Sequence, residues 1–138
     1  MKRFIFILIV TIFNANTSFA IQNKILINVG TQIITSYELK NRIKTILVLS
    51  NKELNQENVN RTKSEAINFL INTKLKKEEI LKFGTAPNSG AISRYLNNIS
   101  SQYNTDINGL KKIFINNDIS YELFLEGIET EFAWQQLI

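Results

Sequence analysis

The chain has 138 residues, with 16 lysine and arginine side chains against 12 acidic ones, and it contains neither cysteine nor histidine. The missing cysteines exclude disulfides and thiolate chemistry, and the missing histidines exclude the commonest general base and the commonest transition-metal ligand. No basic cluster is dense enough to predict a nucleic-acid interface, so the composition favours one small domain that binds a partner and has no catalytic residue, metal or cofactor.

The first twenty residues have the pattern of a secretory signal peptide. Two basic residues precede an apolar run at residues 4–13 (FIFILIVTIF), and small residues lead to a cleavage site between Ala20 and Ile21. An uncleaved membrane anchor is the alternative, but the run is about half of the ~20 apolar residues that span a bilayer. We therefore expect residues 21–138 to be an exported, soluble and periplasmic domain that keeps no stable membrane insertion.

The mature chain opens with a predicted hairpin. Residues 25–29 (ILINV) and 32–34 read as two short strands. Gly30-Thr31 lies between them, with glycine first, as a type II′ turn prefers. A two-stranded hairpin is marginal alone, so it is expected to pack on helices.

Five helices are predicted after the hairpin from apolar residues at three- and four-residue spacing. Thr35 and Glu38 fit a capping box, Ser89 and Ser120 are expected N-caps, and Gly84 fits a helix end. Residues 51–60 are expected to be a loop that has room for one turn of helix. The predicted helices run from Thr35 to Ser50, from Arg61 to Phe83, from Gly90 to Tyr103, from a Thr105 or Asp106 cap to about Phe114, and from Tyr121 to Ile138.

Several charged residues on these helices are expected to be solvated. The basic run contains Lys74, Lys76 and Lys77, and two glutamates follow it at once, which is typical of an exposed helix face. Glu129 and Glu131 are two residues apart and diverge on a helix, so they are not expected to form a catalytic pair.

The order of motifs resembles the SurA N-terminal domain family over residues 25–138. The hairpin leads into Ile33–Leu39 (IITSYEL), and the long helix carries similar residues from Phe69 to Gly84. The final helix begins within Ile119–Phe124 (ISYELF) and ends in Glu131–Ile138 (EFAWQQLI), both similar to the family's pattern. Gly30, Lys76, Lys77 and Thr85 depart from that pattern.

The resemblance implies a mainly α fold of the trigger-factor/SurA peptide-binding type, with a short β-hairpin followed by about five helices. It also implies an ATP-independent periplasmic chaperone, which is not an enzyme and uses no cofactor. Its partners would be unfolded outer-membrane proteins or aromatic-rich peptides, and it would assist outer-membrane protein assembly.

Two alternatives stay open beside the chaperone. Family members carry parvulin isomerase domains, and no such sequence follows Ile138, so the chain is expected to be either a stand-alone short form or a truncated product. The first alternative is therefore a remnant of a parvulin-type peptidyl-prolyl isomerase. The second is a partner-binding module that forms a homodimer.

The final helix supplies the candidate binding residues. Leu123, Trp134 and Leu137 point away from the main apolar stripe of this helix, so they are predicted to line a peptide- or partner-binding surface. The competing interpretation, which we favour, is that Trp134 packs on the long helix, because aromatic residues at helical spacing are mostly core.

Overall fold

The computed structural model describes residues 23–138, so the predicted cleavage site at Ala20 and Ile21 lies outside the described residues. The described chain is mainly helical, with an antiparallel two-stranded hairpin followed by five helices, which confirms the predicted fold class at this level. The elements are β1 (Ile25–Val29), β2 (Gln32–Thr35), α2 (Ser36–Leu49), α3 (Gln56–Phe83), α4 (Ser89–Gln102), α5 (Ile107–Asn116) and α6 (Tyr121–Leu137).

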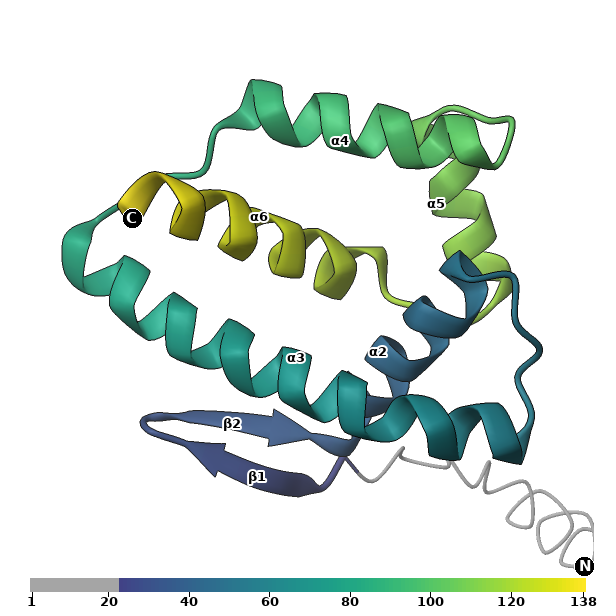
Figure 1. Cartoon of the computed structure of the whole chain (residues 1–138), viewed down its shortest axis with the longest axis horizontal. Coiled ribbons are helices and arrows are strands. Elements are labelled where there is room, and N and C mark those ends of the chain that lie inside the picture. The colour runs from purple at the N-terminus through teal and green to yellow at the C-terminus, as the bar shows by residue number, and fades with distance from the viewer. Residues whose placement is uncertain (1–22) are drawn as a thin grey trace, which may run out of the picture.

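The helices are stacked in layers around α6. Figure 1 shows α4 on one side of α6 and α3 on the other, with the hairpin lying against α3 and with α2 and α5 at one end of the stack. One hydrophobic cluster joins the hairpin, α2 and α3; its buried members are Val29, Ile34, Leu39, Ile43, Leu47, Ala66 and Leu70. A second joins α4, α5 and α6; its buried members are Ile92, Leu96, Ile99, Leu110, Phe114, Ile119, Phe124 and Ile128.

The hairpin turn requires glycine at its first position. Val29 pairs with Gln32, so Gly30 and Thr31 form a two-residue loop, and Gly30 has a φ of +56°. A Cβ at Gly30 would lie 2.7 Å from a carboxylate oxygen of Glu78 on α3. The predicted turn is therefore present, and a larger residue at Gly30 would have to displace the Glu78 carboxylate.

Most predicted caps are confirmed by side-chain hydrogen bonds. Thr35 and Glu38 form both halves of the capping box at the start of α2. Asp106 caps α5, Ser120 caps α6, and Gly84 ends α3 at a φ of +65°.

The cap of α4 differs from the prediction by one residue. The side chain of Asn88 accepts a hydrogen bond from the backbone N–H of Ala91, so Ser89 is the first residue of α4 and not its cap. Asparagine and serine are both good N-caps, so the sequence alone did not show which of the two residues caps α4.

The long helix begins at Gln56, five residues before the predicted Arg61, so the turn of helix allowed within residues 51–60 is present as the first turn of α3. Asn55 is the N-cap, and its side chain accepts a hydrogen bond from the backbone N–H of Asn58. Val59 then packs against the hairpin cluster, which stabilises this first turn. None of the described helices is both long enough and apolar enough to cross a membrane.

Candidate functional site

An apolar groove lies where β1, α2 and the connection from α2 to α3 meet. Its volume is about 370 Å³, and it is the most apolar of the larger hollows found on the described residues. The apolar lining residues are Leu26 from β1, Leu39 and Ile43 from α2, Leu54 from the connection and Val59 from α3. Ser36, Lys40 and Lys44 complete the lining.

The groove has a buried floor and an exposed apolar rim. Leu39 and Ile43 are one helical turn apart on α2, and both are buried members of the hairpin cluster. The rim residues are open to solvent: the exposed fraction is 46% for Leu26 and 60% for Leu54. A ligand side chain that entered the groove would therefore contact fixed core atoms below and cover exposed leucines above.

Local hydrogen bonds hold the connection that carries Leu54. The backbone N–H of Lys52 donates to the Leu47 carbonyl at 2.9 Å, and the Asn58 side chain donates to the Glu53 carbonyl at 2.9 Å. These bonds tie Lys52 to α2 and Glu53 to α3, directly before Leu54. The rim leucine is thus presented by an ordered connection.

The charges at the groove are positive. Lys44 is buried, and its amine donates to the Asn117 carbonyl at 2.9 Å and lies 3.6 Å from the Asp118 carboxylate. Its methylene groups therefore line the groove while its charge is paired elsewhere, as is common for long basic side chains. Lys40 is exposed, and no aspartate or glutamate is among the residues that line the groove.

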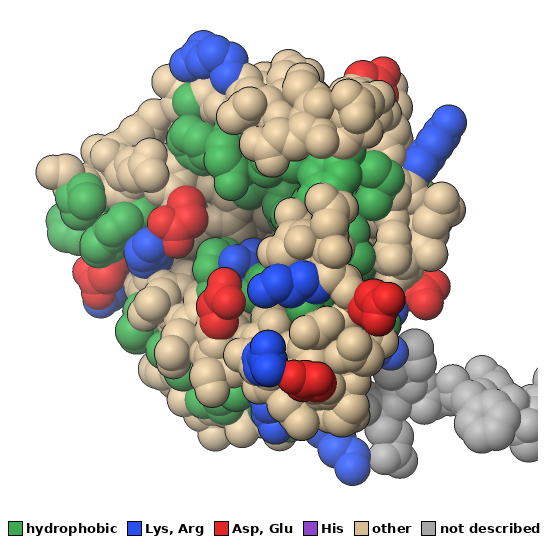
Figure 2. All heavy atoms as spheres, turned by 45° about the vertical axis from the view of Figure 1, so that its right-hand side comes forward, with side chains coloured by type: hydrophobic (Ala, Val, Ile, Leu, Met, Phe, Trp, Pro, Cys, Tyr) green, Lys and Arg blue, Asp and Glu red, His purple; other side chains and the backbone are tan. Residues whose placement is uncertain are grey.

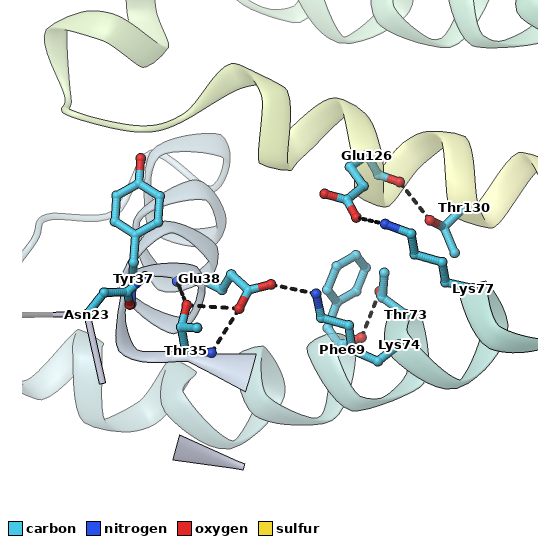
Figure 3. A network of polar contacts seen from close by, with 10 residues as sticks. All are labelled: Asn23, Thr35, Tyr37, Glu38, Phe69, Thr73, Lys74, Lys77, Glu126 and Thr130. Atoms are coloured by element: carbon cyan, nitrogen blue, oxygen red, sulfur yellow. Dashed lines mark hydrogen bonds and ion pairs between the residues drawn. The ribbon is translucent and has the colours of Figure 1, made fainter. Parts of the chain in front are cut away.

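A second cluster, formed by charged pairs, joins α3 to its neighbours. Lys74 pairs with Glu38 of α2 at 2.6 Å, Lys76 pairs with Glu131 of α6 at 2.6 Å, and Lys77 pairs with Glu126 of α6. Two of these pairs are drawn in Figure 3. The three lysines and Glu131 were expected on a solvated helix face, but each reaches a partner on another helix; Lys74 is shielded, while the Lys77 side chain stays 38% exposed.

Glu38 is the most constrained carboxylate of this cluster. Burial alone would raise its pKa, but hydrogen bonds from Lys74 and from the backbone and side chain of Thr35 outweigh burial, so its pKa lies below the ordinary value. These contacts hold it as a charged link between α2 and α3. They satisfy its oxygens fully, which favours a structural role for this residue.

A small cavity lies between α2, α3 and α6. Its volume is about 40 Å³, which suits water and not an organic ligand. The guanidinium of Arg42 lies 3.3 Å from the centre of the Phe69 ring, and burial lowers the pKa of Arg42. Across residues 23–138, no group of three or more acidic side chains is placed to hold a metal ion.

The three predicted binding residues do not form the groove. Leu123 is half-buried and lines the small cavity. Trp134 is half-buried, and the Lys76 amine of α3 lies 6.0 Å from the centre of its ring, so the indole faces α3. Leu137, also half-buried, is the last residue of α6.

Sequence reasoning missed the groove residues, although one signal pointed to them. Leu54 is an apolar residue in an otherwise polar stretch, and it is exposed in the structure. The remaining lining comes from three other elements, which a pattern along the chain does not bring together.

Figure 2 shows one face of the molecule, on which apolar side chains form a band in the upper part while basic and acidic side chains are interspersed below it.

The fold and the groove together place the chain in a broad class of protein: a small, mainly helical protein with an apolar groove on its surface. Comparison with models of known protein families, with curated proteins and with solved structures gave no match to this chain.

Proposed function

We propose that this protein is an ATP-independent chaperone that binds extended, unfolded polypeptide segments. The groove between β1, α2 and the α2–α3 connection is the observation that carries the proposal. Covering an apolar side chain there would contribute about 1.5–3 kcal/mol at full burial. The chain's resemblance to the SurA N-terminal domain family supports a periplasmic location and outer-membrane proteins as clients.

The groove favours weak binding of many different ligand side chains. Its lining is aliphatic and offers few polar groups, so it discriminates little between aromatic and aliphatic ligand side chains. Loss of translational freedom and ordering of the bound segment oppose the gain from burial. A client held by one or two side chains would exchange quickly, which suits a protein that delays aggregation and then releases its client.

The test is a binding titration with residues 21–138, which include both hydrophobic clusters and every described element. A labelled, unfolded outer-membrane protein is titrated by fluorescence anisotropy, after circular dichroism has established that the protein is helical. The double variant Leu26→Asp/Leu54→Asp should bind at least about tenfold more weakly, because it places charge on both sides of the apolar rim.

Leu81→Asp is the matched control, since Leu81 is 68% exposed on α3 and does not line the groove. It should bind as the unmodified protein does. Absence of binding by the folded protein would exclude the proposed function. Equal loss in the control and in the double variant would exclude the groove as the site.

A further inference from the structure

Arg42 of α2 carries a positive charge that no described residue neutralises at close range. Among residues 23–138, its Nε atom is the only buried side-chain nitrogen or oxygen without a hydrogen-bond partner. The rest of its guanidinium forms no hydrogen bond or ion pair with these residues either. A largely buried charge without a partner is destabilising, because it has lost water and gained no opposite charge. Such an arginine needs a physical explanation.

The guanidinium is held in place by an aromatic ring. Its central carbon lies 3.3 Å from the centre of the Phe69 ring, so the two groups are stacked face to face. The ring is held in turn by Gly127 of α6, where an added Cβ would lie 3.2 Å from it. Stacking uses the faces of the guanidinium and leaves the N–H groups at its edge free to donate hydrogen bonds.

The cavity between α2, α3 and α6 is the space beside this guanidinium. Arg42 and Phe69 both line it, and its volume is about 40 Å³. That volume is room for about three water molecules. A halide ion needs little more room than a water molecule, whereas a peptide segment does not fit.

The charges around the cavity leave one positive charge in excess. Two carboxylates line it, those of Glu38 and Glu126. Each already pairs with a lysine of α3, Glu38 with Lys74 and Glu126 with Lys77. Figure 3 shows the Phe69 ring pointing from α3 into the space between these two pairs. Because the pairs cancel, the charge of Arg42 matches one monovalent anion.

The nearest other carboxylates do not replace such an anion. Glu65 and Glu131 attract the guanidinium from a distance, but burial outweighs this attraction and the pKa of Arg42 lies below its ordinary value. Glu131 is paired with Lys76 of α3. Glu65 is exposed on α3, where water screens its charge.

We infer that this cavity binds one small monovalent anion, such as chloride, through the N–H groups of Arg42. The bound anion would join α2, α3 and α6 around the Phe69 ring, so the stability of the fold would depend on the anion concentration. Arg42 does not line the apolar groove, so this inference is independent of the proposed function.

The first test is urea unfolding of residues 21–138 at constant ionic strength, with sodium chloride replacing sodium gluconate. Gluconate has the same charge as chloride but is too large for the cavity. An anion that binds only the folded state lowers the unfolding equilibrium constant, by about tenfold when its concentration is about ten times Kd. A saturable decrease of this kind is expected, and no dependence on chloride would overturn the inference.

Two arginine variants separate the cavity from the protein surface. Arg42→Gln should abolish the response to chloride, and without chloride it should unfold no more readily than the unmodified protein, because it removes an unpaired buried charge. Arg94→Gln is the matched control, since Arg94 is exposed on α4 and does not line the cavity. It should keep the full response. An equal response in all three proteins would overturn the inference, because chloride would then act elsewhere.

NMR of the arginine Nε–H groups tests the site in the unmodified protein, so it does not depend on the folding of any variant. Chloride replacing gluconate should shift the Arg42 signal saturably, with the same half-saturating concentration as in the unfolding experiment. The Arg94 signal is the internal reference and should not shift. A missing shift at Arg42, or equal shifts at both arginines, would overturn the anion site.

Discussion

A single carboxylate, that of Glu38, links the start of α2 to the middle of α3. It accepts from the backbone N–H of Thr35 at 2.8 Å and from the amine of Lys74 at 2.6 Å. Its exposed fraction is only 14% and that of Lys74 is 13%, so water screens the pair weakly. The capping box was predictable because its members are three residues apart. The Lys74 contact was not, because 36 residues separate the two side chains.

This link predicts a loss of stability in acid. The pKa of Glu38 is lower in the folded state than the ordinary value of 4.5, so the charged carboxylate stabilises the fold above that pH. That stabilisation disappears as the pH falls from about 4.5 through the lower folded pKa. Glu38→Gln should lower the free energy of unfolding by about 1–3 kcal/mol at neutral pH and flatten its decline in acid.

Urea unfolding measured between neutral pH and about pH 3 checks this prediction. Lys74→Met is the companion variant, because it removes the strongest partner of Glu38. It should also make the free energy of unfolding decline less steeply as the pH falls. Curves for both variants that run parallel to that of the unmodified protein would show that other groups cause the acid sensitivity.

At the scale of single elements, the hairpin depends on its turn. Gly30 and Gly84 both have a positive φ, but only Gly30 has a close neighbour, whereas no atom lies within 4 Å of a Cβ at Gly84. Backbone strain in the left-handed region costs about 1–2 kcal/mol for a residue with a Cβ. Substitution at Gly30 adds the displacement of the Glu78 carboxylate to that strain.

Gly30→Ala should therefore lower the free energy of unfolding more than Gly84→Ala does, by an extra amount that reflects the Glu78 contact. Both variants should lose at least about 1 kcal/mol in urea unfolding followed by circular dichroism. The double variant Gly30→Ala/Glu78→Ala should lose about as much free energy of unfolding as Gly84→Ala does. Equal losses in the two single variants would contradict the contact with α3.

The predicted elements were correct where short-range chemistry decides them. Caps, the turn glycine and apolar periodicity all act within about four residues, so β1, β2 and the ends of most helices could be predicted. The start of α3 was missed because Asn55 follows other polar residues that suit a loop equally well. The groove was beyond prediction because Leu26, Ile43 and Leu54 meet only after the hairpin has packed on α2.

At the scale of the whole molecule, α6 connects the two hydrophobic clusters. Its residues Phe124 and Ile128 are buried among α4 and α5, while Glu126 and Glu131 pair with lysines of α3. The groove belongs to the other cluster, through Leu39 and Ile43. Loss of the α4–α5–α6 core should therefore reach the groove through α6 and α3, and also directly through α2, whose Lys44 lines the groove and donates to the Asn117 carbonyl.

Phe114 tests this connection, because it is fully buried on α5 and its ring centre lies 4.7 Å from that of Phe124. Phe114→Ala should lower the free energy of unfolding by about 3–5 kcal/mol, since it removes a large core side chain and leaves a cavity. Phe83→Ala is the control; Phe83 is 68% exposed on α3, and its loss should change stability little.

Amide exchange measured on the two variants shows whether the fold unfolds as one cooperative unit or as two independent halves. If α6 couples the clusters, Phe114→Ala should accelerate exchange in α2 and α3 as well as in α4 and α5, because global unfolding then limits protection everywhere. Acceleration confined to α4, α5 and α6 would contradict the coupling. The hairpin, α2 and α3 would then be a unit that keeps the groove without the second core.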